Sequence, residues 1–260
     1  MHEDAIVIGG LGVVGKATCR ALGIGAIYDY KGLEDLGNAS VGGATGAAIA
    51  LARYIFLCLP TPTVRGKCDT SALRQYIKDF GPGHVYVIRS TVPPGTAEDL
   101  MEEFLGTLIV SNPEFLTEST ADQDALHPDL VVLGAPMDWV LQDVWCRFYR
   151  DIDAKRVIFT DNRTAEFIKY AINTFYATKV LFANALYDVA ESVGVDYGVV
   201  RDAMYARKWV GRNHLTVPWK GKRGVDGKCL PKDLEAFATY SHSEFFEYMQ
   251  AESQAYRGED

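Results

Sequence analysis

Short apolar runs rich in Val, Ile and Tyr recur along the first part of the chain, and most are separated by helix-like or glycine-rich segments. The runs predict strands at residues 5–9, 25–29, 54–60, 85–89, 107–111, 129–134 and 156–160. The intervening segments predict helices at residues 16–22, 71–79 and 96–104. Because strands that alternate with helices build parallel sheets, the pattern predicts an α/β domain with a doubly wound, mostly parallel sheet over residues 1–160.

From Thr164 onward the apolar positions follow a helical spacing instead. They predict one long helix that runs to about Gly194, and Asp161 or Asn162 can cap its start. Further helices are predicted at residues 197–207 and 231–238, on either side of a polar loop at 211–228. The sequence therefore predicts a helical second domain over residues 161–260.

The composition narrows the class of protein. With 48% hydrophobic residues among 260, the chain can bury one large core or two smaller ones, and its net charge of -8 argues against a nucleic-acid partner. The five cysteines form no CxxC pair and no zinc spacing, so no metal site is expected. Without a signal peptide or an apolar run of about 18 residues, a cytoplasmic protein with no membrane segment is expected.

The turn after the first strand has the pattern of a dinucleotide site. It reads GGLGVVGKAT and places Gly10, Gly12 and Gly15 in a GxGxxG arrangement at a strand-to-helix junction, as in a Rossmann-type fold. In such turns the phosphates face the helix N-terminus. The residues expected to hold the cofactor here are Gly10, Leu11, Gly12, Val13, Val14 and Gly15. Asp29 ends the second strand where a carboxylate accepts hydrogen bonds from the adenosine ribose, which favours NAD over NADP; otherwise it is a plain turn residue.

Three further stretches follow predicted strands and carry polar side chains. They are CLPTPT at 58–63, RSTVPPGT at 89–96 and SNPEFLTES at 111–119. Because the carboxyl ends of parallel strands lie at one edge of a sheet, where ligands bind in open α/β folds, we expect their Ser, Thr and Glu side chains to line one crevice. The alternative is that their Pro and Thr residues only shape loops.

Two groups in the second half of the chain are candidates for chemistry. Lys169 and Asn173 are four residues apart on the long helix and share a face, with Glu166 one turn earlier, although such a face is often simply solvated. Cys229 lies in GVDGKCLPKD between Lys228 and Lys232, whose charges favour a thiolate. A thiolate can trap an aldehyde covalently, so this cysteine is a candidate nucleophile.

Taken in order, the segments GLGVVG, PTPT, STVPPGT, NPEFLTE, AEFIKYAINTFYATKVLFANA and GKCLPKD resemble the UDP-glucose/GDP-mannose 6-dehydrogenase family of nucleotide-sugar dehydrogenases, over most of residues 5–238. The resemblance implies an NAD-dependent, four-electron oxidation of a nucleotide sugar. UDP-glucose oxidised to UDP-glucuronate, for polysaccharide biosynthesis, is the leading expectation. It also implies a homodimer formed through the long helix.

The resemblance assigns roles to individual residues. Cys229 would form a thiohemiacetal and then a thioester, Lys169 and Asn173 would hold the developing alkoxide, and Asp233 would assist the hydrolysis. Thr91 and Glu114 would place a water and exchange protons. Further cofactor contacts are expected from Leu59, Pro60, Thr61, Pro62, Thr63, Ser90, Thr91, Val92 and Glu118. Substrate contacts are expected from Glu114, Phe115, Leu116, Lys169, Asn173, Lys220, Arg223 and Gly224.

The sequence departs from the family pattern in two ways. Family members continue beyond the CxxKD element into a third domain that grips the nucleotide, whereas these 260 residues end 27 residues after Asp233, so a short form is expected. Asp226 also stands where the family has a glycine. We expect the basic cluster at Lys220, Lys222 and Arg223 to compensate in part by meeting phosphates.

Two other functions remain open from the sequence. One is a simpler hydroxyacid-type NAD dehydrogenase, which also pairs a Rossmann domain with a helical domain but needs no covalent thiol, so Cys229 argues against it. The other is a catalytically silent NAD-binding protein. The presence together of all six candidate catalytic residues argues against a silent protein.

Overall fold

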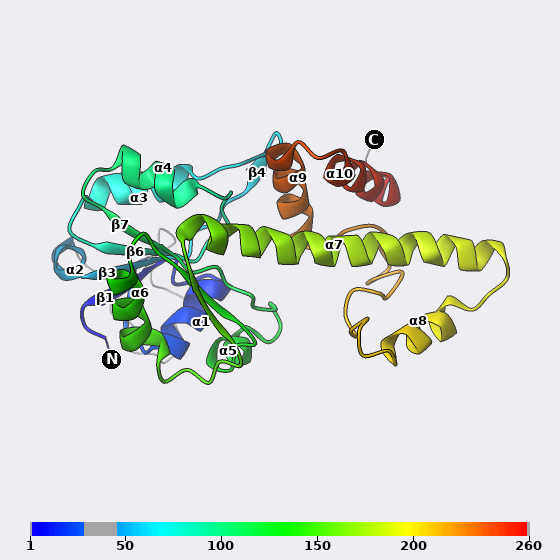
Figure 1. Ribbon diagram of the computed structural model, residues 1–260, viewed down its shortest axis with the longest axis horizontal. Coiled ribbons are helices and arrows are strands. Elements are labelled where there is room, and N and C mark those ends of the chain that lie inside the picture. The colour runs from blue at the N-terminus through cyan, green and yellow to red at the C-terminus, as the bar shows by residue number, and fades with distance from the viewer. Residues whose placement is uncertain (1, 29–45, 259–260) are drawn as a thin grey trace. The chain divides into compact units, whose positions relative to one another are not determined.

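The computed structural model describes residues 2–28 and 46–258, which form two compact units (Figure 1). Unit 1 comprises Met1–Thr61 and Asp69–Lys169, and unit 2 comprises Pro62–Cys68 and Tyr170–Asp260. The division therefore falls inside helix α7 (Asn162–Ser192), nine residues later than the 160/161 boundary predicted from the sequence. Residues 62–68, predicted as part of the first domain, belong to unit 2.

Unit 1 is built on one sheet of seven described strands. The described strands are β1 (Ala5–Ile8), β2 (Ala26–Tyr28), β3 (Tyr54–Leu57), β6 (Val85–Ile88), β7 (Leu108–Ser111), β8 (Val131–Gly134) and β9 (Val157–Thr160). They lie in the order β2-β1-β3-β6-β7-β8-β9, and every neighbouring pair is parallel except β7 and β8. The predicted doubly wound, mostly parallel sheet is confirmed.

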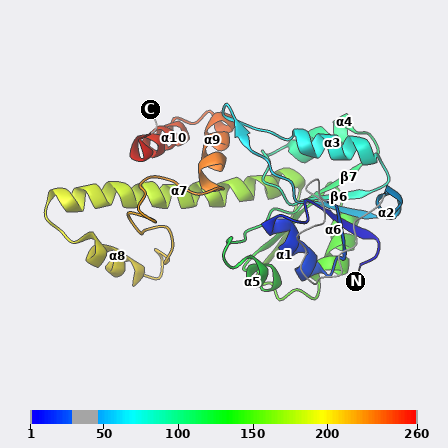
Figure 2. The same cartoon turned by 180° about the vertical axis from the view of Figure 1, so that it is seen from behind.

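Alternate residues of the strands face opposite layers of helices. Tyr54 and Phe56 pack in one core with residues of α1 (Val13–Leu22), α6 (Asp138–Val144) and the π-helical turn η1 (Trp145–Tyr149). Ile55 and Leu57 pack in the other core with α2 (Gly46–Leu51), α3 (Ser71–Phe80) and α4 (Thr96–Glu103). Figure 2 shows α1 beside α5 (Ala121–Leu126), its neighbour in the first layer. Both faces of the sheet are thus buried, which explains the continuous apolar runs.

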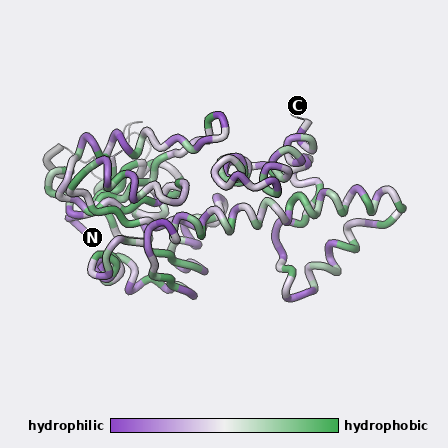
Figure 3. Tube along the Cα trace, turned by 45° about the horizontal axis from the view of Figure 1, so that its top comes forward, coloured by the Kyte–Doolittle hydropathy of each residue, from purple (hydrophilic) through white to green (hydrophobic). Residues whose placement is uncertain are grey.

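Unit 2 is helical, as predicted. It contains α7 from Tyr170 onward, α8 (Tyr197–Tyr205), α9 (Leu230–Ser241), α10 (Glu244–Arg257) and a short hairpin of β4 (Thr63–Val64) and β5 (Lys67–Cys68). Its buried residues include Ala177, Leu181, Val225, Leu234 and Met249. Figure 3 shows hydrophobic residues concentrated in the strands of unit 1, whereas hydrophilic and hydrophobic residues alternate along α7. Within the described ranges, no helix has both the length and the apolar character needed to cross a bilayer.

Seven described elements were not predicted, and each lacks a clear sequence signal: the hairpin strands β4 and β5, the turn η1 and helices α2, α5, α6 and α10. Helices α5 and α6 are only 6 and 7 residues long. The turn η1 continues directly from α6. Helix α10 has 14 residues, but Phe245 and Tyr248 are exposed, so its apolar positions do not mark a single buried face.

Residues at the start of α7 fasten it to the sheet of unit 1. Asp161 caps the helix, because its Oδ1 accepts a hydrogen bond of 2.8 Å from the backbone N–H of Thr164. Asn162 is buried and makes a different connection: its Oδ1 accepts from Ser111 N at 2.9 Å, and its Nδ2 donates to Ile109 O at 3.1 Å. The first residue of α7 thereby satisfies two backbone groups of strand β7.

Replacing Asn162 by alanine is expected to lower the free energy of unfolding by about 3 kcal/mol, because a buried N–H and a buried C=O lose their partners. Urea denaturation followed by circular dichroism measures this loss. Asn213→Ala, at an exposed position, is the matched control and should change stability by less than about 0.5 kcal/mol. Equal effects of the two substitutions would contradict this account of Asn162.

Candidate active site

The turn between β1 and α1 and the start of α1 contain four glycines, and the three of the motif, Gly10, Gly12 and Gly15, have different surroundings. A Cβ atom on Gly15 would lie 2.3 Å from Gly9 O and 2.6 Å from the Cα of Gly10, so only glycine lets the helix approach the strand this closely. A Cβ on Gly10 would lie 2.3 Å from the side chain of Ile27 in β2. A Cβ on Gly12, by contrast, would meet only Gly9 O, at 3.4 Å. Folding thus requires a small residue at positions 10 and 15, whereas position 12 has open space beside it.

This open space suits a dinucleotide. Gly12 stands at the N-terminus of α1, where no side chain caps the helix and the first turn carries no acidic residue. The first amides of a helix have no partner within it and attract phosphate oxygens. The residues Gly10 to Gly15 therefore fit the pyrophosphate of NAD. Asp29, the predicted partner of the ribose, lies outside the described residues.

The loops after β3 and β6 are held together by hydrogen bonds between predicted cofactor residues. The Ser90 hydroxyl donates to Leu59 O at 2.7 Å and accepts from Leu59 N at 3.0 Å. The Thr61 hydroxyl donates to Thr91 O at 2.7 Å. The structure thus brings Leu59, Thr61, Ser90 and Thr91 together at the carboxyl edge of the sheet. The predicted cofactor residues Pro62 and Thr63 belong instead to unit 2.

Lys169 and Glu114 form a buried pair in unit 1. The Lys169 ammonium donates to the backbone O of Glu114 at 2.6 Å and lies 3.2 Å from its Oε1. The other carboxylate oxygen, Oε2, accepts from Leu116 N at 2.7 Å. The Lys169 Nζ also lies 5.2 Å from the centre of the Phe115 ring. The loop after β7 is therefore shaped around the Lys169 ammonium, although Glu118 further along it is exposed.

Behind this pair lies a buried polar network that the sequence did not suggest. The Arg89 guanidinium and the Tyr149 hydroxyl both donate to the side-chain oxygen of Asn112, and Asn112 Nδ2 donates to Val132 O at 2.7 Å. The network joins the ends of β6, β7 and β8 to the π-helical turn. Only the position of Arg89 and Asn112 directly after buried strands hinted at it.

Glu166 also makes contacts in the site that the sequence did not predict. It is buried, and its carboxylate accepts hydrogen bonds from Gly95 N at 2.7 Å, Ala97 N at 3.0 Å and the Ser111 hydroxyl at 3.0 Å. Burial raises the pKa of Glu166 to about 8, although the three donated hydrogen bonds oppose this effect. The sequence showed only its place one turn before Lys169.

In unit 2, helices α7 and α9 share a buried carboxylate. Asp233 is 1% exposed, and its Oδ2 accepts a hydrogen bond of 2.6 Å from Asn173 Nδ2. The Lys232 ammonium pairs with its other oxygen. A carboxylate at this depth needs such partners to offset its lost hydration. Asn173 and Asp233, predicted from separate motifs, are therefore in direct contact.

Cys229 is exposed and immediately precedes α9. Its backbone O accepts from Asp233 N at 3.1 Å, so the thiol and the buried carboxylate belong to the same first turn. The helix N-terminus favours a thiolate there. Burial acts oppositely on two cysteines of unit 1, where it raises the pKa of Cys19 to about 12 and that of Cys58 to about 11. Of these three thiols, Cys229 is the one suited to nucleophilic attack.

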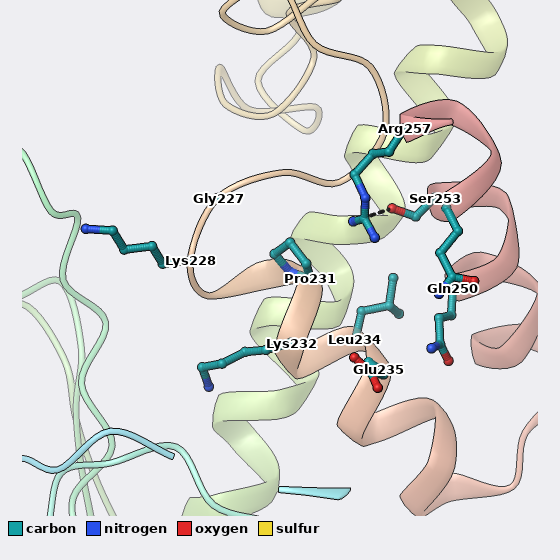
Figure 4. Close-up of a pocket in the computed structure, with 10 residues that line it drawn as sticks. Gly227, Lys228, Pro231, Lys232, Leu234, Glu235, Gln250, Ser253 and Arg257 are labelled. Atoms are coloured by element: carbon teal, nitrogen blue, oxygen red, sulfur yellow. Dashed lines mark hydrogen bonds between the residues drawn. The ribbon is translucent and has the colours of Figure 1, made fainter. Parts of the chain in front are cut away.

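Helix α9 is flanked within unit 2 by the hairpin and by α10. The Thr63 hydroxyl donates to Lys232 O at 2.7 Å, and Gly66 N donates to Glu235 Oε1 at 2.8 Å. A cavity of about 240 Å³ lies between α9 and α10, and Figure 4 shows the residues that line it. Arg257 and Ser253 are hydrogen-bonded beside this cavity, whereas Lys228 and Lys232 extend away from α10. Cys229, Asn173 and Asp233 are not among its lining residues.

Arg223 and Lys222 of the basic cluster make contacts within unit 2 that the sequence did not predict. The Arg223 guanidinium donates to Asn184 Oδ1 and Asp188 Oδ1, both at 2.7 Å. Gly224 N donates to Asn184 Oδ1 at 3.2 Å. Lys222 lies 3.2 Å from Asp226. These contacts fasten the loop to α7 and engage the cations of Arg223 and Lys222 within unit 2.

Trp219 and Lys220 of the loop are exposed. The Lys220 ammonium lies 5.6 Å from the centre of the Trp219 ring, at a tight turn in which Trp219 and Lys222 exchange backbone hydrogen bonds. The hydrogen bond from Gly227 N, followed by the Lys222 contact, lowers the pKa of Asp226, which therefore remains charged near neutral pH. Among the residues with described positions, no cluster of His, Cys, Asp or Glu could hold a metal ion.

Comparison with known proteins relates these features to one family. A sequence model for the NAD binding domain of the UDP-glucose/GDP-mannose dehydrogenase family matches residues 33–153, and a model for its central domain matches residues 163–255. The UDP-glucose 6-dehydrogenase of Rhizobium meliloti is 33% identical over 204 residues, which are 73% of this chain and 46% of that protein. The GDP-mannose 6-dehydrogenase of Pseudomonas savastanoi is 33% identical over 214 residues, which are 75% and 48%.

A solved structure gives the same result for the fold. The UDP-glucose dehydrogenase of the hyperthermophilic archaeon Pyrobaculum islandicum has a TM-score of 0.82 and 27% sequence identity, and the match covers 99% of this chain and 68% of that one. The chain spans about half the length of the curated relatives it matches. The match to the NAD binding domain confirms NAD as the cofactor.

The open space at Gly12 gives a test that separates binding from folding. Gly12→Ala should weaken NAD binding at least about tenfold and change the free energy of unfolding by less than about 0.5 kcal/mol, because its methyl group enters the space left for the pyrophosphate. Gly15→Ala should instead destabilise the protein by about 3 kcal/mol. Titration with NAD and urea denaturation measure the two effects. Unchanged NAD affinity in Gly12→Ala would place the pyrophosphate elsewhere.

Proposed function

Since the chain belongs to the UDP-glucose/GDP-mannose dehydrogenase family, we propose that it oxidises the 6-hydroxyl group of a nucleotide sugar to a carboxylate, in two steps that each use one NAD. UDP-glucose is the first substrate to test, and UDP-glucuronate would be its product. The observation that carries the proposal is the first turn of α9, where the exposed Cys229 precedes the buried Asp233, and where Asp233 contacts Asn173. An aldehyde-trapping thiol and a buried carboxylate are what a four-electron oxidation requires.

In the first oxidation the substrate loses a hydride and a proton. Gly10 to Gly15 would hold NAD, which would supply the hydride acceptor. The Lys169 ammonium supplies positive charge for the oxygen that becomes negative, and Asn173 supplies an amide N–H. These two side chains occupy successive turns of α7. Glu114 holds the Lys169 ammonium in place. Because the pair is almost fully buried, water screens the charge of the ammonium only weakly.

The second oxidation needs a covalent bond to the protein. The Cys229 thiolate attacks the aldehyde carbon, the carbonyl oxygen takes a proton, and the resulting thiohemiacetal can lose a second hydride. Loss of that hydride and of the hydroxyl proton leaves a thioester at Cys229. Water then attacks the thioester carbon, and the bond from that carbon to the Cys229 sulfur breaks. The carboxylate product is released and the thiol is restored.

Hydrolysis of the thioester requires an oriented water and a proton acceptor. Asp233 is the proposed acceptor in unit 2, because its carboxylate is fixed by Asn173 and Lys232 and lies one helical turn from Cys229. Thr91 and Glu114 of unit 1 are proposed to place the water and to exchange protons with it. Thr91 is held at its backbone O by Thr61, which limits its movement.

The stoichiometry of the reaction tests this proposal. UDP-glucose with excess NAD should yield two NADH per sugar, and Cys229→Ser should lower kcat about a thousandfold or more, as loss of a covalent nucleophile does. Cys146→Ser, at another exposed cysteine, is the matched control and should leave kcat unchanged. NADH fluorescence and chromatography of the products provide the measurements.

The same assay distinguishes the other functions. One NADH per substrate, with a retained activity in Cys229→Ser, would indicate a simpler hydroxyacid-type dehydrogenase. Binding of NAD without reduction by UDP-glucose, GDP-mannose or other nucleotide sugars would indicate a silent NAD-binding protein. If GDP-mannose is oxidised faster than UDP-glucose, the proposed reaction is retained and GDP-mannose is the better substrate.

We also propose that the protein is a homodimer formed through α7. Phe175, Phe182 and Val189 recur every seven residues, which is close to two helical turns, so they lie on one face. They are 61%, 55% and 57% exposed in the single chain. Such a row of large apolar side chains is typical of a helix that packs against another helix.

Replacing Phe182 by glutamate is expected to dissociate the dimer, because it places a charge in the middle of this apolar row. Size-exclusion chromatography with light scattering should then give the mass of one chain in place of two. Leu105→Glu adds the same charge at a position 81% exposed in unit 1 and should leave the mass of a dimer. A dimer that survives Phe182→Glu would exclude this face of α7 as its interface.

A further inference from the structure

Glu166 is a buried acid that the steps above do not use. It is 3% exposed, and both carboxylate oxygens are engaged: Oε2 accepts from Gly95 N, and Oε1 accepts from Ala97 N and the Ser111 hydroxyl. The two amides belong to the start of α4, whose own N-terminal residue Gly95 has no side chain to cap it. Glu166 therefore caps α4 from a different helix.

The two segments held by Glu166 carry other candidate groups. Gly95 and Ala97 follow the loop that contains Thr91, and Ser111 ends β7 three residues before Glu114. On α7, Lys169 lies three residues after Glu166 and holds Glu114. Contacts from Glu166 to Ser111 and from Lys169 to Glu114 thus join the same two pieces of chain, one helical turn apart.

Glu166 and Lys169 also line a common cavity. It has a volume of about 10 Å³, and its polar lining comes from Ser90, Thr91, Ser111, Glu166 and Lys169. This is about the smallest volume that holds one water molecule, and a buried water needs two to four polar partners. The carboxyl group of Glu166 therefore borders the same small polar space as the ammonium of Lys169 and the loop residue Thr91.

From these contacts we propose that Glu166 is a positioning residue for the oxidation: it fixes the Thr91 loop and the end of β7 against α7, and so sets the place of the Lys169 ammonium. The inference rests on the proposed function for its role in catalysis. The coupling between Glu166 and Lys169 does not depend on that function and can be measured without substrate.

The charge of Glu166 depends on pH in a range that is easy to reach. Burial raises its pKa to about 8 from 4.5 in water, and Glu98 of α4 adds like-charge repulsion. Arg163 beside Gly95 and Lys169 on the same helix are the cations around it. Below pH 8 the neutral carboxylic acid places an O–H where one of its oxygens accepted a hydrogen bond, and above pH 8 the carboxylate makes all three contacts.

Loss of the proton from Glu166 lowers the stability of the fold, whereas it strengthens the contacts that position Lys169. Because the folded pKa is raised, the folded protein binds this proton more tightly than the unfolded chain does. The stabilising contribution is complete below pH 4.5 and is lost as the pH rises through 8. A merely structural Glu166 would therefore show itself in unfolding alone, whereas a positioning residue also changes the reactivity of Lys169.

The test measures acetylation of Lys169 by acetic anhydride, quantified by mass spectrometry, in the wild type and in Glu166→Gln. At pH 9 the glutamine variant should be labelled about threefold faster, because its amide cannot accept all three hydrogen bonds and so loosens the segments that cover Lys169. At pH 7, where Glu166 is neutral, the two rates should agree. Asp99→Asn, an exposed acid in the first turn of α4, is the control and should match the wild type at both pH values.

Equal labelling of wild type and Glu166→Gln at pH 9 would overturn the proposal, whatever the substrate. Should Glu166→Gln not fold, Glu166→Asp withdraws the carboxylate by one methylene group and should give the same faster labelling at pH 9. With substrate, Glu166→Gln should lower kcat about tenfold at pH 9 and change KM less than threefold. Altered labelling in a protein that oxidises no nucleotide sugar would refute the proposed function and retain the coupling.

Discussion

Parallel pairing brings the ends of β1, β3, β6 and β7 to one edge of the sheet, and the candidate groups of unit 1 depend on it. Each strand ends in a different loop, yet the loops are then tied by single side chains. Ser90 and Thr61 join the second loop to the third, and Glu166 joins the third to the end of β7. A change of register in any of these strands would move a loop by one residue and reverse which side chains face the helices.

Unit 2 keeps a carboxylate out of water beside an exposed thiol. Asp233 would be costly to bury alone, and Asn173 and Lys232 supply the hydrogen bonds that make its burial possible. The hairpin from 62–68 adds a contact to Lys232 O. The first turn of α9 is thereby held rigidly, while the sulfur at its start stays accessible.

Much of the fold was readable from the sequence because its signals are local. Apolar runs mark the strands, and one long helical spacing marks α7. The contacts of Ser90 with Leu59 and of Thr61 with Thr91 also follow from a local rule, since these residues lie in loops that follow parallel strands. The part of Glu166 could not be read in this way, because its partners lie 55 to 71 residues away in the sequence.

Arg223 shows the limit of charge patterns in the same way. The phosphate site that three cations within four residues suggest stays a prediction, and nothing in the sequence indicates that Arg223 contacts Asn184 and Asp188. A guanidinium binds both carboxylates and phosphates, so the sequence alone does not give its partners. The elements α5 and α6 were missed because 6 or 7 residues are too few to establish a helical period.

Gly12 has more space beside it than Gly10 and Gly15, the other two glycines of the motif. At positions 10 and 15 a larger residue would collide with the protein itself, so selection for folding alone would preserve glycine there. At position 12 a methyl group has room, and the N-cap of a helix accepts several residues besides glycine. Gly12 is therefore the position of the motif at which a larger side chain would narrow the space beside the helix without colliding with the fold.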